Sequence, residues 1–125
     1  MPYADPVRRP RRQKYGKLIR DRIPRIIEES GSSCRVRRLS PGEYGRALRE
    51  KIREEAEEML RARGRNALIN ELIDIQELLD AIRRSLGMGA GIFLEAVRRK
   101  RRERGGFRKR LFLEYTEGRA GRSGR

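Results

Sequence analysis

Hydrophobic residues in the middle of the chain follow the period of two consecutive amphipathic helices. In residues 66–86 they recur at alternating spacings of four and three, which places them on one helix face and predicts a packing seam. The preceding segment, residues 40–63, has an equivalent seam in which Glu55 occupies a position that the period assigns to the core. The two seams consist of Leu68, Leu72, Ile75, Leu79, Ile82 and Leu86, and of Leu48, Ile52, Glu55, Met59 and Ala62.

Local signals predict where these two helices begin and end. Residues 40–43, Ser-Pro-Gly-Glu, combine a serine cap, a proline in the first turn and a capping-box glutamate. Asn66 is expected to cap the second helix, which stops before Gly87. The break between the helices, residues 63–66, is short enough to force an antiparallel hairpin.

The flanking segments predict three smaller features. A short helix is expected over residues 24–30, and a third long helix over residues 92–104. Alternating apolar and polar residues in 107–115 predict a strand that pairs with residues 34–39 in a small ribbon. The predicted fold class is therefore mainly α, built on an antiparallel helix hairpin, with a minor two-stranded β ribbon.

Charge is unevenly distributed along the chain. Lys and Arg number 33 against 18 Asp and Glu, which gives a formal net charge of +15. Residues 1–25 carry a net charge of +7 and residues 98–125 a net charge of +9, whereas residues 43–80 carry −3. An acidic centre with basic ends can attract polyphosphates, and equally the phosphates of RNA or DNA.

A length of 125 residues suits one domain with tails. We expect a basic flexible arm over residues 1–13, the domain over residues 14–116 and a basic flexible tail over residues 117–125. Hydrophobic residues make up 36%, so a homo-oligomer, a dimer or tetramer, would help to bury the helix faces.

Cellular context follows from what the sequence lacks. Cys34 is the only cysteine, which excludes an intramolecular disulfide. No apolar stretch is long enough to span a membrane, and no signal-peptide core is present. The expected location is therefore cytoplasmic, with no membrane partner.

The acidic residues of the two central helices form a matched set. Glu55 and Glu58 are three apart, as are Glu71 and Asp74, so each pair shares a helix face. Pairing positions about the middle of the break puts Glu55 opposite Asp74 and Glu58 opposite Glu71. Four like charges at one level need a positive partner, and oxygen ligands favour Mg²⁺, with Mn²⁺ as a substitute. The alternative is an ordinary solvated face, which we expect for the other acids of these helices, Glu50, Glu57, Glu77 and Asp80.

Three sequence segments resemble the motifs of a known superfamily. The E-E-x-x-E of residues 54–58 followed by the E-x-x-D of residues 71–74 resembles the signature of the MazG-like, all-α nucleoside triphosphate pyrophosphohydrolases. That superfamily includes phosphoribosyl-ATP pyrophosphohydrolase and dimeric dUTPases. Residues 17–24, K-L-I-R-D-R-I-P, resemble the K-L-V-R-D-K-I-P opening of one small MazG-like subgroup, and residues 104–107, R-G-G-F, resemble a segment near its C-terminus. The resemblance covers residues 14–116.

The resemblance implies a hydrolytic function. Members cleave a nucleoside triphosphate between the α and β phosphates to give the monophosphate and pyrophosphate, which removes non-canonical nucleotides. By the matching positions, the magnesium ligands would be Glu55, Glu58, Glu71 and Asp74. Glu54, beside the first ligand, is the candidate catalytic acid or water-orienting base.

Three basic residues near the N-terminus are candidates for substrate binding. Lys17, Arg20 and Arg22 are candidates to bind phosphates, since arginine makes bidentate contacts and lysine acts as a point charge. The alternative is a surface ion-pair cluster with Asp21.

Four further residues are substrate-binding candidates with plainer alternatives. Asn70 would contact ribose or base, or be an ordinary polar surface residue. Gly105 and Gly106, beside Arg104, would allow close backbone approach to a ligand, or would end a helix.

Two non-enzymatic hypotheses compete with hydrolysis. The first is a basic RNA- or DNA-binding protein on a MazG-like scaffold, with contacts made by the Arg-rich ends. The second is a purely structural helical oligomer, which explains the seams but not the carboxylates placed on them.

Overall fold

The computed structural model describes residues 11–119, and these residues form four helices and no β-strand. The chain divides into two compact units, one ending at Gly87 and the other beginning at Met88. The first unit contains α1 (Ile23–Glu29), α2 (Pro41–Arg61) and α3 (Arg65–Ser85). The second contains α4 (Ala90–Arg104), followed by a non-helical segment. The mainly α prediction is confirmed. The ends of the expected basic arm and tail, residues 1–10 and 120–125, lie outside the described residues.

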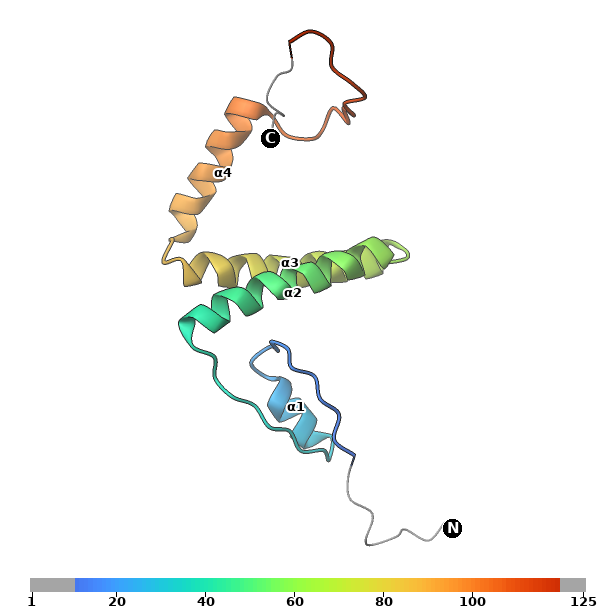
Figure 1. Cartoon of the computed structure of the whole chain (residues 1–125), viewed down its shortest axis with the longest axis vertical. Coiled ribbons are helices and arrows are strands. Elements are labelled where there is room, and N and C mark those ends of the chain that lie inside the picture. Colours follow the sequence, from blue (N-terminus) through green and yellow to red (C-terminus); the bar gives the residue numbers. More distant parts are fainter. Residues whose placement is uncertain (1–10, 120–125) are drawn as a thin grey trace, which may run out of the picture. The chain divides into compact units, whose positions relative to one another are not determined.

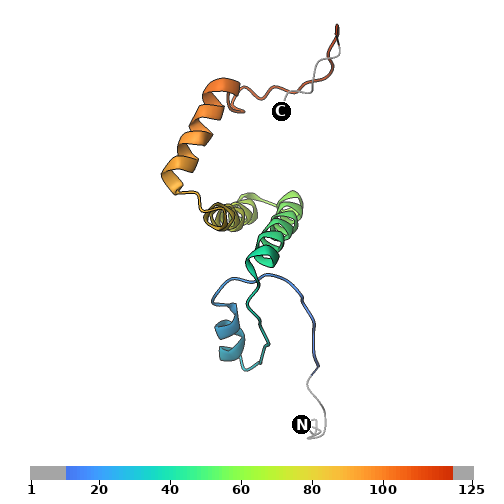
Figure 2. The ribbon, with the colours of Figure 1, turned by 60° about the vertical axis from the view of Figure 1, so that its left-hand side comes forward.

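Helices α2 and α3 pack side by side in opposite directions and are joined at one end by a short link (Figures 1 and 2). The capping box predicted at the start of α2 is present: the backbone N–H of Glu43 donates to Ser40 Oγ at 3.3 Å, and the backbone N–H of Ser40 donates to Glu43 Oε1 at 3.2 Å. Arg37 also pairs with Glu43 at 3.0 Å. These contacts lower the pKa of the Glu43 carboxyl to about 2, and the hydrogen bond from Arg37 is the main cause. The start of the hairpin is therefore held by local hydrogen bonds.

The start of α3 differs from the prediction. Gly64, with φ of 84°, is the cap residue, and no side chain donates or accepts a capping hydrogen bond there. The expectation that Asn66 caps this helix is wrong, because the helix already includes Arg65. Glycine adopts a positive φ without steric cost, so the chain turns into α3 at Gly64.

The predicted β ribbon is also wrong for the described residues. Residues 34–39 and 107–115 are both non-helical and non-strand, and they belong to different units. A strand needs a neighbour to pair its backbone N–H and C=O groups, and two strands alone are marginally stable in water. Alternation in the sequence gives the right face pattern but does not supply that neighbour.

The interior of the hairpin is small. Among residues 11–119, Leu48 on α2 is the one apolar side chain that is fully buried, with 1% of its surface exposed. On α3 the predicted seam is only partly covered, since Leu68 and Leu72 are 43% and 52% exposed. No helix in the described chain combines the length and apolar character needed to cross a bilayer.

We expect Leu48→Ala to lower the free energy of unfolding by about 2–5 kcal/mol, because it removes buried methyl groups and leaves a cavity. The matched control is Leu60→Ala in the same helix, where the leucine is 87% exposed and the loss should stay within about 0.5 kcal/mol. Urea unfolding followed by circular dichroism measures both. Equal losses would contradict the assignment of the core to Leu48.

Candidate functional site

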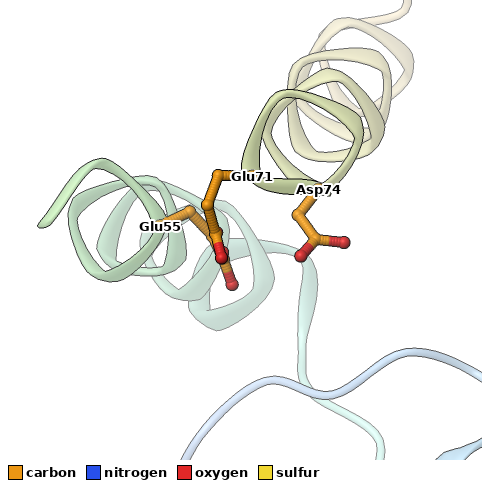
Figure 3. A group of neighbouring side chains, drawn as sticks. All are labelled: Glu55, Glu71 and Asp74. Carbon is orange, nitrogen blue, oxygen red and sulfur yellow. The ribbon is translucent and has the colours of Figure 1, made fainter. Parts of the chain in front are cut away.

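Three carboxylates converge where α2 and α3 pack together. Glu55 comes from α2, and Glu71 and Asp74 come from α3, where their spacing of three puts them on one face (Figure 3). One carboxylate oxygen from each lies within 4.8 Å of the others. The sequence argument predicted these three to meet.

Glu55 is the most deeply placed of the three. Its exposure is 8%, and burial is the largest cause that raises its pKa to about 7. A hydrogen bond with Glu71 raises the pKa further, as does repulsion from Glu58, Asp74 and Glu71. The Glu55 carboxyl therefore holds its proton to a higher pH than an ordinary glutamic acid, and in the protonated form it donates a hydrogen bond to Glu71.

Arg20 brings the N-terminal segment to the same place. Its Nη2 lies 2.6 Å from Asp74 Oδ1, which joins a residue before α1 to the middle of α3. The sequence alternative of a local ion pair with Asp21 is not what forms: the described residues give Arg20 its ion pair with Asp74. A phosphate-binding candidate thus lies directly beside a metal-ligand candidate.

The donor atoms fit a divalent cation. Within the described residues, Glu55 Oε2 and Glu71 Oε2 are buried oxygens without a hydrogen-bond partner. A buried acceptor left unpaired costs free energy, and hard oxygen donors at this spacing suit Mg²⁺ or Mn²⁺. The proton on Glu55 and the guanidinium of Arg20 neutralise part of the negative charge, and the two unpaired oxygens still lack a positive or donating partner.

Glu58 does not join the cluster in this structure. Its side chain is exposed on α2, although its charge still acts on Glu55. Glu58 lies three residues beyond Glu55, which is about 60° around the helix from the contact line. Matching positions across the hairpin predicted that Glu55, Glu71 and Asp74 lie close together, but it did not predict the direction of the Glu58 side chain.

Glu54 faces a different neighbour. Its Oε2 accepts from Lys51 Nζ at 3.1 Å, and both line a small pocket of about 90 Å³ together with Lys17 and Glu50. Sequence reasoning missed Lys51, although a cation three residues before a glutamate on a helix is a recognisable pairing signal. The pocket combines two cations and two acids beside the N-terminal segment.

The other predicted contacts of the first unit lie on its surface. Lys17 holds its ammonium 5.5 Å from the centroid of the Tyr15 ring as well as lining the pocket. Arg22 is the cap residue of α1 and Asn70 lies on α3, and both are exposed. In the described part of the chain, no hydrogen bond or ion pair joins either of them to the carboxylate cluster, so their roles stay predictions.

Arg104, Gly105 and Gly106 belong to the second unit. Gly105, with φ of 82°, ends α4, which is the helix-capping alternative for this glycine. A left-handed φ explains glycine here without a ligand. A substrate-binding role for this segment stays a prediction.

The raised pKa of Glu55 predicts how stability depends on pH. Since the folded carboxyl has a higher pKa than the unfolded one, the folded state binds more protons between about pH 4.5 and 7. The free energy of unfolding of the metal-free protein should therefore fall as the pH rises through this window, by at most about 1.4 kcal/mol per pH unit.

Urea unfolding in EDTA at several pH values measures this slope. Glu55→Gln, which mimics the protonated acid, should remove most of the fall, whereas Glu57→Gln, an exposed neighbour, should leave it. The lowered pKa of Glu43 produces the opposite trend, but only between about pH 2 and 4.5, where the unfolded state binds the proton more readily than the folded state. A slope unchanged by Glu55→Gln would show that this carboxyl does not carry the proton.

The chain has sequence similarity to one described relative, which carries no assigned activity. No family model matches the chain, and no solved structure matches it. A protein of Mycolicibacterium smegmatis (strain ATCC 700084 / mc(2)155), described as uncharacterized, is 43% identical over 53 residues, which cover 42% of this chain and 54% of that protein. The chain thus spans about half the length of this curated relative, whose description assigns no activity.

Proposed function

We propose that the α2–α3 hairpin forms the active site of a magnesium-dependent nucleoside triphosphate pyrophosphohydrolase of the MazG-like, all-α kind. The reaction cleaves the α–β phosphoanhydride and releases a monophosphate and pyrophosphate, with non-canonical nucleotides as the substrate class. The observation that carries the proposal is the convergence of three carboxylates from two helices, two of them with buried oxygens that lack a partner.

In this proposal the carboxylates hold the cation. Glu55, Glu71 and Asp74 are the inner ligands, and Glu58, one turn along α2, is an additional ligand that would have to turn inward. A bound Mg²⁺ would polarise phosphoryl oxygens and neutralise charge that develops on them. Deprotonation of Glu55 is required before its oxygens become good ligands.

The neighbouring side chains supply position and proton transfer. Arg20, already 2.6 Å from Asp74, can exchange that carboxylate for a substrate phosphate as the ligands turn to the cation. Glu54 is the proposed general base or water-orienting group, and its ion pair with Lys51 orients the carboxylate. Lys17, which lines the pocket beside Glu54, adds a cation for the phosphate chain.

We also propose that the protein works as a homo-oligomer. The exposed side of α3 presents a shallow apolar surface that includes Ile69, Leu72 and Ile73. A second copy presents the same surface, and two-fold pairing of identical apolar strips is the commonest way to bury such a face. The hairpin fully buries one leucine among its described residues, so burial of this apolar surface in a dimer would add to its stability.

The first test of the enzyme is turnover. The purified protein is incubated with standard and modified nucleoside triphosphates in magnesium or in EDTA, and pyrophosphate is measured by phosphorus NMR. We expect pyrophosphate release only with magnesium, and a loss of at least about 100-fold in Asp74→Asn, because a cation ligand is weaker as an amide.

Asp80→Asn is the matched control, since it makes the same chemical change six residues later on α3, where the acid pairs with Gln76 at 3.3 Å. It should retain activity within about threefold. Glu58→Gln tests whether that side chain turns inward: a loss comparable to Asp74→Asn supports the fourth ligand. Full activity of Asp74→Asn would refute the proposed site.

Cation binding should also release a proton. Because Glu55 has a pKa of about 7 in the metal-free protein, Mg²⁺ must displace its proton below neutral pH. Affinity should rise by up to about tenfold per pH unit up to pH 7 and then level off. Calorimetric titration in two buffers of different ionisation enthalpy measures the protons released. A pH-independent affinity between pH 6 and 8 would contradict Glu55 as a ligand.

A further inference from the structure

The end of α4 and the chain that follows it form a strongly basic, exposed stretch. Residues 98–110 contain nine basic and one acidic residue, and every side chain in this range is exposed. Within the described chain, Arg102 pairs with Glu95 at 3.0 Å, and no other cation of the stretch has an acidic partner there. A surplus of about eight positive charges is therefore free to meet an anionic partner.

Aromatic side chains are interleaved with these cations. Phe107, Phe112 and Tyr115 are 98%, 89% and 74% exposed. A backbone turn is closed by the Arg110 N–H, which donates to the Phe107 carbonyl at 3.2 Å. Three cations, Arg108, Lys109 and Arg110, lie between Phe107 and Phe112 along the chain. Large apolar rings in water are unfavourable, so rings as exposed as these are candidates for contact with a ligand.

We propose that residues 98–115, the basic–aromatic segment, bind single-stranded nucleic acid. The arginines and lysines would contact backbone phosphates, and Phe107 and Phe112 would stack on unpaired bases. Arginine-rich segments with stacking aromatics are the chemistry that single strands require, because every base has a π face and every nucleotide a phosphate. A duplex offers the phosphates but keeps its bases stacked inside.

A lipid surface fits the same segment less well. An interfacial helix needs apolar and basic residues on opposite sides of the same turns. In α4 they are separated along the axis instead: Ile92, Phe93, Leu94 and Val97 lie in the first half, and residues 98–104 contain no apolar side chain. The last two turns therefore have no face to insert between lipids. A second copy of the segment is excluded by repulsion between like charges.

The proposal is tested by fluorescence anisotropy with labelled oligonucleotides of about 20 nucleotides. The buffer contains EDTA, so that no divalent cation binds the carboxylate cluster. Oligouridylate and oligothymidylate should both bind, and a duplex of equal length should bind at least about tenfold more weakly. A preference between the two single strands would identify RNA or DNA as the natural ligand. Binding of the duplex as tightly as the single strands would overturn the stacking role.

Phosphate contacts are tested through the salt dependence. Replacing Arg98, Arg99 and Arg101 by Gln should reduce the log–log salt slope by about 2, because each phosphate contact contributes about 0.7 for a single strand. The matched control replaces three exposed arginines of the first unit, Arg35, Arg38 and Arg46, with Gln. Glutamine keeps helix propensity, so circular dichroism should be unchanged in both. An equal effect of both triple variants would refute the assignment to α4.

Stacking is tested by truncating rings. Phe107→Ala combined with Phe112→Ala should weaken binding about tenfold or more with an unchanged salt slope. Leu111→Ala combined with Leu113→Ala is the control, since these side chains are 86% and 76% exposed in the same segment but cannot stack. Equal losses in the two double variants would refute base stacking. Binding to anionic phospholipid vesicles without binding to oligonucleotides would replace the proposal with a lipid surface.

Discussion

The packing of carboxylates against one another between α2 and α3 is the constraint on which the rest of the first unit depends. Glu55 occupies a seam position where a leucine or methionine would add apolar burial, in a hairpin that fully buries one leucine. A buried acid beside two others is unfavourable through desolvation and repulsion. A chain with so little core gains no stability from an acid at this position, and this is the reason to propose that the acid binds a cation.

Three positive species can neutralise this cluster, and they compete. The raised pKa of Glu55 favours a proton on its carboxyl, the guanidinium of Arg20 pairs with Asp74, and a divalent cation would use the oxygens left unpaired. In the proposed function, replacement of the first two by the cation would couple its binding to proton release and to loss of the contact between Arg20 and Asp74. Cation binding would also release Arg20 from Asp74, and the free guanidinium would lie beside the cation, where it could bind a phosphate.

The sequence predicted the level of this site better than its details. Periodicity assigned Glu55 to the core, and the spacing of three put Glu71 and Asp74 on one face, because helix geometry determines both. The outward direction of Glu58 and the pairing of Arg20 with Asp74 depend on how separate elements pack, which spacing does not encode. The β ribbon failed for the same reason, since a strand is defined by its neighbour.

The hairpin and the basic–aromatic segment would meet phosphate in opposite ways, because the hairpin gathers acids at its centre and the segment gathers cations. The hairpin gathers acids, so an anionic ligand can approach its centre only when a cation bridges the two. The basic–aromatic segment meets phosphates directly and holds rings that a triphosphate chain cannot use. Direct contacts weaken with salt through counterion release, whereas a buried, cation-bridged contact is screened much less. Neither chemistry substitutes for the other, so a cation-bridged nucleotide site and a nucleic-acid surface can coexist in one chain.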